Sequence, residues 1–308
     1  MRDHDATTCK SIRQARKRGK KYGNSLLSIS NSTLPVYHTT TNSFTTSGII
    51  ATSPSALAGT MSSLIDKAKN VVSSHKKSDG SLPKVLFVLS SHDQMGDTGK
   101  PTGWYLPEFA HPYYKLEGKA EIVIASPKGG AAPLDPSSVE MFKSDEESTK
   151  FLKEKEALWK NTQKLSDFVG KANTFDAVFY VGGHGPMFDL ATDPVSHQLI
   201  KEFYESGKVV SAVCHGPAAF VNVKLSDGSW LVQGQEVTGF TNTEEDQVQL
   251  SAAMPFMLET ELEAHGGKVV KAEPWQPKVV KSGKSNKLIT GQNPASASPI
   301  GEAILAAL

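Results

Sequence analysis

The chain has 308 residues, enough for one large α/β domain or two smaller ones. Its 33 basic and 32 acidic residues leave a formal net charge of +1, so no overall field favours nucleic acid or a membrane as partner. No apolar run is long enough to cross a bilayer, and the two cysteines, Cys9 and Cys214, lie in very different sequence surroundings. We therefore expect a soluble protein of a reducing compartment, without a disulfide scaffold.

Residues 1–60 differ in composition from the rest of the chain, because basic side chains cluster near the start and a Ser/Thr-rich stretch follows. Such a segment buries too little apolar surface to offset its ordering entropy, so we predict a disordered extension. Three interpretations stay open: a mitochondrial transit peptide, a nuclear-targeting signal at residues 16–21, or an extension seldom made because synthesis starts at Met61. We expect a cytoplasmic protein unless such a signal acts, and a short helix and linker at residues 61–82.

An α/β domain is predicted over residues 83–308. Apolar runs predict strands at residues 84–90, 121–126, 175–181, 209–213, 268–271, 278–281 and 287–290. Helical or charged patterns predict helices at residues 104–116, 144–169, 195–204, 257–265 and 299–308. Residues 230–240 are expected to form a hairpin-like insertion. Strands that alternate with helices at this spacing predict a parallel sheet sandwiched between helices.

The most chemically informative stretch is residues 208–220. Its apolar strand runs into Cys214, His215 and Gly216, where a helix is expected to begin. Such a turn lifts the thiol above the sheet at a helix N-terminus, which favours the thiolate. A lone cysteine is more often a small buried side chain, but a strand-to-helix turn of this kind also displays serine nucleophiles. We therefore interpret Cys214 as a nucleophile, with His215 as its proton partner if the chain bends sharply.

Other candidates come from neighbouring strand ends, because the carboxyl ends of parallel strands meet at one edge of a sheet. Glu108 follows the first strand by one helix, so its carboxyl group can approach the sulfur, although an acid early in a helix is also a common dipole partner. The Gly182-Gly183 turn offers backbone amides for an oxyanion, but glycines are ordinary at such turns.

A run of three acids at residues 244–246 is typical of solvated surface, unless one of them orients His215. A metal site is the alternative interpretation of the histidines near predicted element ends, which are His92, His111, His184 and His215. No tight His-x-x-x-His or Cys-x-x-Cys spacing supports that site, and no complete phosphate-binding glycine motif occurs. We therefore expect no metal and no cofactor.

Several segments stand out together: residues 212–217 (Ala-Val-Cys-His-Gly-Pro), 180–185 (Tyr-Val-Gly-Gly-His-Gly), 108–112, 238–241 and 290–297. Jointly they resemble the PfpI/ThiJ superfamily of class I glutamine amidotransferase-like proteins. They are most similar to its heat-shock-chaperone branch, which includes the glutathione-independent glyoxalases (glyoxalase III). The resemblance covers roughly residues 83–308 and implies a flavodoxin-like fold with small insertions.

The resemblance also implies a site and a reaction. The implied roles are Cys214 as nucleophile, His215 as base, Glu108 as the acid beside the thiol, Glu245 as third triad member with Glu244 as the fallback, and Gly182 and Gly183 on the oxyanion side. The implied reaction converts methylglyoxal, a small 2-oxoaldehyde, to lactate without a cofactor. It proceeds through a hemithioacetal on the sulfur, an enediol and a thioester, and protects against reactive aldehydes. We expect a homodimer, although such proteins associate in more than one way.

Two other functions stay open at this point. The first is a stress-responsive holding chaperone for unfolded client proteins, or a redox sensor whose Cys214 is oxidised. The second is a cysteine peptidase or amidase that uses the same nucleophile. Substitution of Cys214 by Ser separates the first from a glyoxalase, because it should abolish turnover and leave suppression of aggregation intact.

Overall fold

The protein is described here by a computed structural model, which covers residue 77 and residues 80–308. The predictions for residues 1–60, and most of the predicted helix and linker at residues 61–82, lie outside the described residues. Within the described part of the chain, no helix has both the length and the apolar character that crossing a bilayer requires.

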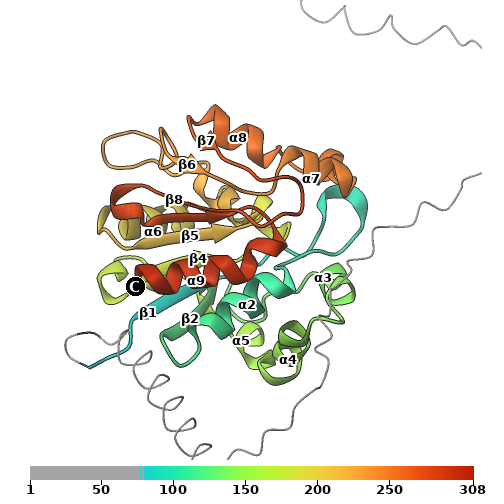
Figure 1. Cartoon of the computed structure of the whole chain (residues 1–308), viewed down its shortest axis with the longest axis horizontal. Coiled ribbons are helices and arrows are strands. Elements are labelled where there is room, and N and C mark those ends of the chain that lie inside the picture. The colour runs from blue at the N-terminus through green and yellow to red at the C-terminus, as the bar shows by residue number, and fades with distance from the viewer. Residues whose placement is uncertain (1–76, 78–79) are drawn as a thin grey trace, which may run out of the picture. The chain divides into compact units, whose positions relative to one another are not determined.

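A seven-stranded sheet forms the centre of the described domain (Figure 1). From edge to edge its strands are β3 (Gln163–Lys164), β2 (Glu121–Ser126), β1 (Lys84–Val88), β4 (Ala177–Tyr180), β5 (Val209–Val213), β9 (Leu288–Gly291) and β8 (Val279–Ser282). Neighbouring strands are parallel except β8, which runs antiparallel to β9. The central strands are apolar and almost wholly buried, as expected where helices cover both faces. The predicted α/β class is confirmed.

The helices around this sheet are α2 (Leu106–Leu116), α3 (Pro136–Met141), α4 (Glu146–Glu154), α5 (Glu156–Lys160), α6 (Pro194–Glu205) and α9 (Ala297–Ala307). Of these, α3 and α4 pack on α2, and α5 packs on α4. Figure 1 shows α2 and α9 side by side across the sheet, with α6 behind the strands. The approach of α2 to α9 is close, since a Cβ on Gly301 would lie 2.8 Å from the Cα of Pro112. Glu108 lies in the first turn of α2, so this packing fixes the helix that carries one candidate residue.

A smaller unit adjoins β8 (Figure 1). It consists of β6 (Glu236–Val237), α7 (Asn242–Gln247), α8 (Leu258–Ala264) and β7 (Lys268–Val269). The insertion predicted at residues 230–240 returns to a strand, β6, as expected, but the hairpin-like part of the prediction is wrong, because β6 pairs in parallel with β7, with Glu236 opposite Lys268. A parallel partner is distant in sequence, so no local turn signal announces it.

The helix prediction for residues 144–169 is wrong in part. Helices α4 and α5 occupy its first half, but Gln163 and Lys164 then join the sheet edge as β3. Both of these side chains are exposed, as is usual on an edge strand. A short charged edge strand and a charged helix have similar compositions, which is why the sequence did not separate them.

Candidate active site

Cys214 follows β5 directly and has a left-handed backbone, with φ of 59°. This conformation is unusual for a residue with a Cβ and is held by hydrogen bonds on both sides. Its N–H donates to Gly291 O at 2.9 Å, and its carbonyl accepts from the Phe240 N–H at 2.8 Å. The sharp turn expected from the sequence is present, and it places the thiol in a pocket above the sheet edge.

The helix expected after Cys214 is only a five-residue 3₁₀ helix, Gly216–Phe220. Its first residue packs tightly, since a Cβ on Gly216 would lie 2.5 Å from Tyr180 O. So short a segment aligns few peptide dipoles, and burial raises the pKa of the Cys214 thiol well above its usual range. The expectation that this turn by itself favours the thiolate is therefore wrong, and the thiol needs a base.

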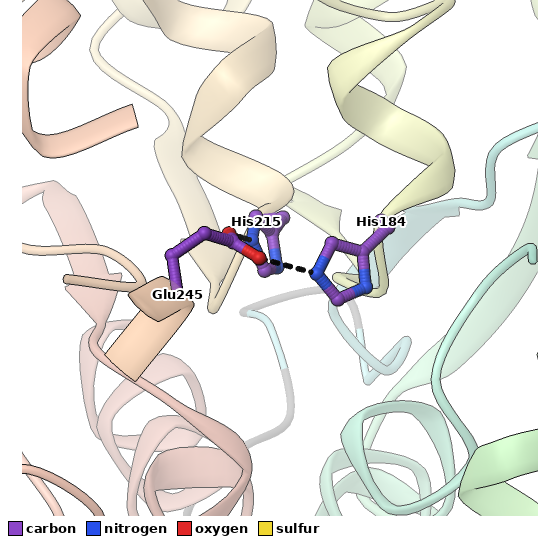
Figure 2. Close-up of side chains that lie close together, drawn as sticks. All are labelled: His184, His215 and Glu245. Atoms are coloured by element: carbon purple, nitrogen blue, oxygen red, sulfur yellow. Dashed lines mark hydrogen bonds and ion pairs between the residues drawn. The ribbon is translucent and has the colours of Figure 1, made fainter. Parts of the chain in front are cut away.

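His215 lies where it can act as that base. Its Nδ1 lies 3.4 Å from the Cys214 sulfur. Its Nε2 lies 2.6 Å from Glu245 Oε2 (Figure 2). Burial, and then the nearby His184, lower the pKa of His215, so the ring is neutral at neutral pH. Because a carboxylate can only accept, the ring proton is assigned to Nε2, and Nδ1 is free to receive the thiol proton.

The choice between Glu244 and Glu245 follows from the start of α7. Thr241 caps this helix in a capping box with Glu244, whose carboxylate also accepts from the Trp275 N–H at 2.8 Å and the Asn293 amide at 2.8 Å. Glu245, one residue further round the helix, reaches His215 instead. The Thr-x-x-Glu spacing at residues 241–244 is a capping signal that could have assigned Glu244 from sequence.

Sequence reasoning missed the contact made by His184. Its Nε2 lies 3.0 Å from Glu245 Oε1, so the one carboxylate is hydrogen-bonded to both imidazoles (Figure 2). The His184 and His215 rings have centroids 4.1 Å apart. Burial opposes ionisation of Glu245, but the two histidines outweigh it and hold its pKa far below the usual range. The sequence indicated His184 only as part of a glycine-rich turn and as a metal candidate, since its partner is 61 positions away.

Glu108 lies on the other side of the thiol and is fully buried. Its oxygens have no hydrogen bond of good geometry among the described residues, and the polar groups beside them are the Cys214 sulfur and the amides of Gly182 and Gly183. Burial raises the pKa of Glu108 well above its usual range, which favours the protonated carboxyl group. A neutral Glu108 does not repel a thiolate and has an O–H to donate to it.

The turn of Gly182 and Gly183 brings backbone against the thiol. A Cβ on Gly182 would lie 2.2 Å from Glu108 Oε2 and 2.9 Å from the Cys214 Cβ, so only glycine fits. Gly183 has φ of 96°, and its backbone N–H lowers the thiol pKa against the effect of burial. The structure thus brings His215, Glu108, Gly182 and Gly183 around the Cys214 sulfur, with Glu245 on the far side of His215.

These groups open into a pocket of about 270 Å³. Apolar side chains dominate its lining, which includes Met95, Pro101, Met141, Phe240, Val248, Leu250, Trp275 and Pro294. Cys214, His184 and His215 also line this pocket. A largely apolar pocket with few convergent polar groups suits a small organic substrate.

Two of the four histidine candidates for a metal site are elsewhere. His92 bonds to Gln94 O at 2.6 Å, and His111 pairs with Asp145 at 2.8 Å. The remaining pair, His184 and His215, converges on Glu245, with one donor atom of each residue within 4.8 Å of the others.

Comparison with known proteins agrees with this geometry. Residues 108–307 match the DJ-1/PfpI family. The chain is 33% identical over 235 residues to Glyoxalase 3 of Candida albicans, covering 73% of this chain and 98% of that protein. It is 31% identical over 234 residues to the glutathione-independent glyoxalase hsp3102 of Schizosaccharomyces pombe, covering 73% of this chain and 96% of that protein.

A solved structure is similar as well. The crystal structure of glyoxalase III from Candida albicans matches with a TM-score of 0.65 and 31% identity, over 73% of this chain and 97% of that one. The flavodoxin-like fold implied by the sequence resemblance is thereby confirmed. With its family match and these relatives, the chain belongs to the DJ-1/PfpI family.

Proposed function

We propose that this protein is a glutathione-independent glyoxalase that converts methylglyoxal and water to lactate. The observation that carries the proposal is the strained Cys214 in a small pocket, with His215 Nδ1 3.4 Å from its sulfur and the fully buried Glu108 on the other side. Relatives that share about a third of their residues with the chain over nearly their full length bear the name glyoxalase. The proposed substrate class is a small 2-oxoaldehyde.

The first step is addition of the sulfur to the aldehyde carbon. The Cys214 thiol gives its proton to His215 Nδ1, 3.4 Å away, as the carbon–sulfur bond forms. The resulting imidazolium is stabilised by Glu245, which is ionised. Protonation of the former aldehyde oxygen completes a neutral hemithioacetal. The Gly183 amide beside the sulfur is suited to stabilise that oxygen while it carries charge.

The second step moves a hydrogen between carbons. Once it has delivered its first proton, His215 removes the proton from C1 of the hemithioacetal, giving an enediol, and returns a proton to C2. The product is a thioester of lactate on Cys214. Water then cleaves the carbon–sulfur bond, releases lactate and restores the thiol. Atoms balance without an oxidant or a cofactor, because C1 is oxidised as C2 is reduced.

Glu108 is proposed to act through its proton. In its protonated form the carboxyl group donates a hydrogen bond to the developing and departing thiolate, which stabilises the charge on the sulfur. An ionised carboxylate at this position would instead disfavour the thiolate. The protonated state of Glu108 is therefore part of the mechanism.

The pocket favours this reaction over peptide cleavage. Its volume of about 270 Å³ accommodates a compact substrate, whereas a peptide needs an open cleft along several residues. Use of Cys214 as a redox sensor, a role as a holding chaperone for unfolded client proteins, a homodimeric state and a cytoplasmic location stay predictions from the sequence.

The test is lactate formation from methylglyoxal by reduced protein without glutathione, run beside Cys214→Ser. We expect turnover by the wild type and a loss of at least roughly 10⁴-fold in the variant. Suppression of aggregation of a heat-denatured client is measured for both proteins. Wild type that makes no lactate with a free thiol, yet suppresses aggregation, would replace the glyoxalase by the chaperone.

A further inference from the structure

Three nitrogen and oxygen donors converge from segments far apart in the sequence. His184 follows β4, His215 follows β5, and Glu245 lies on α7 (Figure 2). One ligand atom of each lies within 4.8 Å of the others. The reaction proposed above uses His215 and Glu245 for proton transfer but gives His184 no step of its own.

The three side chains are held in place before any ligand arrives. His215 is 1% exposed, Glu245 4% and His184 9%. The two imidazoles pack on each other and against Phe240, with ring centroids 4.1 Å apart for the pair and 4.5 Å between His215 and Phe240. Fixed donors lose little conformational entropy on binding an ion, which favours affinity.

Two imidazoles and one carboxylate form a donor set suited to zinc and similar ions. A tetrahedral zinc ion holds such ligands at about 2.0–2.1 Å, and hence about 3.3 Å from one another. Glu245 Oε2 lies 2.6 Å from His215 Nε2, and Glu245 Oε1 lies 3.0 Å from His184 Nε2, so the three groups already converge on one place. The fourth position faces the pocket, because His184 and His215 both line it.

We propose that His184, His215 and Glu245 form a binding site for a divalent transition-metal ion of the zinc type, and that the bound ion inhibits turnover. Coordination through Nε2 of a neutral His215 leaves its proton on Nδ1, the atom 3.4 Å from the Cys214 sulfur. A protonated Nδ1 cannot accept the thiol proton. The ion thus removes the base without touching the sulfur.

Binding is tested on the full chain in a Cys214→Ser background, so that no thiolate at residue 214 contributes. Calorimetry with Zn²⁺ and visible absorption with Co²⁺ should show one tight site and the strong bands of a tetrahedral ion. Adding His184→Gln or Glu245→Gln should weaken that site by roughly 100-fold, whereas His111→Gln is the matched control and should leave it unchanged. Circular dichroism verifies that each variant is folded.

Equal Zn²⁺ affinity in the Cys214→Ser protein with and without His184→Gln would overturn the site. So would weak binding with the pale spectrum of an octahedral Co²⁺ ion. This part of the test does not depend on the reaction, so it stands even if the glyoxalase proposal fails.

Inhibition, which rests on the proposed function, is tested with the wild type. Zn²⁺ should suppress lactate formation, and a chelator should restore it. The Co²⁺ form of the wild type should show no sulfur-to-metal charge-transfer band, because Cys214 is not a ligand. Full activity at Zn²⁺ concentrations that fill the site, or a charge-transfer band that assigns the ion to Cys214, would contradict the inhibitory mechanism.

Discussion

Two glutamates flank the Cys214–His215 pair, and their surroundings shift their pKa values in opposite directions. Glu108 is fully buried without a cationic partner or a hydrogen bond of good geometry, and its pKa is raised. Glu245 is nearly as buried but contacts two imidazoles, and its pKa is lowered. The same side chain is therefore a neutral donor on the sulfur side of the pair and an anion on the imidazole side. The difference lies in the partners, since burial opposes ionisation of both.

The largest loss of activity is expected from substitution of His215, because this residue contacts both Cys214 and Glu245. His215→Gln removes the proton acceptor for Cys214 and the partner of Glu245 together. We expect kcat for lactate formation to fall by roughly 10⁴-fold, the upper range for loss of a general base. Steady-state kinetics with thiol titration check this, and a fall below tenfold would mean that another group takes the proton.

The substitution Glu245→Gln removes the ionised glutamate of the comparison. The amide keeps the shape but offers one acceptor to two N–H donors and favours the wrong tautomer of His215. We expect kcat to fall by roughly 10³-fold. NMR of the imidazole nitrogens reports the tautomer, and an unchanged tautomer combined with lost activity would contradict this explanation.

The substitution Glu108→Gln tests the neutral glutamate. It should reduce activity less than Glu245→Gln, because a neutral amide still donates a hydrogen bond. We expect a loss of roughly tenfold, the equivalent of weakening one hydrogen bond to a charged group. Glu108→Leu, which has no donor, should be slower than Glu108→Gln in the same kinetic assay. Equal rates for Gln and Leu would show that the proton of Glu108 does not serve the sulfur.

The two glutamates should also have opposite effects on stability as a function of pH. The pKa of Glu108 is raised in the folded state. Its contribution to the free energy of unfolding is therefore complete below the ordinary carboxyl pKa and is lost as pH rises toward the folded pKa. The folded pKa of Glu245 is lowered, so its stabilisation is complete above the ordinary value and is lost as pH falls. Each slope is limited to about 1.4 kcal/mol per pH unit.

Urea unfolding of the wild type, Glu108→Gln and Glu245→Gln across pH measures both terms. Glu108→Gln should remove a decline of stability above the ordinary carboxyl pKa, and Glu245→Gln should reduce the decline below it. Parallel curves for the three proteins would mean that the two carboxyl groups titrate alike.

The smallest catalytic effect is expected at Glu244, the neighbour that does not contact His215. Glu244→Gln weakens the α7 cap and its bonds to Trp275 and Asn293, which should cost about 1–3 kcal/mol of stability. Below the melting temperature kcat should stay within about twofold of wild type, because the hydrogen bonds of Glu244 go to Thr241, Trp275 and Asn293 and not to Cys214 or His215. A loss like that of Glu245→Gln would exchange the roles of the two residues.

Local patterns predicted the central strands and the Cys214 turn, because buried parallel strands are apolar runs and a strand-to-helix turn has a short signature. The position of Glu108 one helix after the first strand indicated that residue, and the family resemblance indicated Glu245; the structure brings them beside Cys214 and His215. His184 was missed because its contact with Glu245 depends on the placement of α7 against β4 and β5. The raised pKa of Cys214 was also missed, since burial is a property of the whole fold.

The most direct test of the account follows the hydrogen at C2 of lactate when methylglyoxal is converted in D₂O. Transfer through His215 and an enediol exposes the moving proton to exchange, so the account predicts deuterium at C2 by NMR. A direct hydride shift from C1 would keep the original hydrogen. Lactate formed by the wild type with no deuterium at C2 would therefore contradict proton transfer by His215.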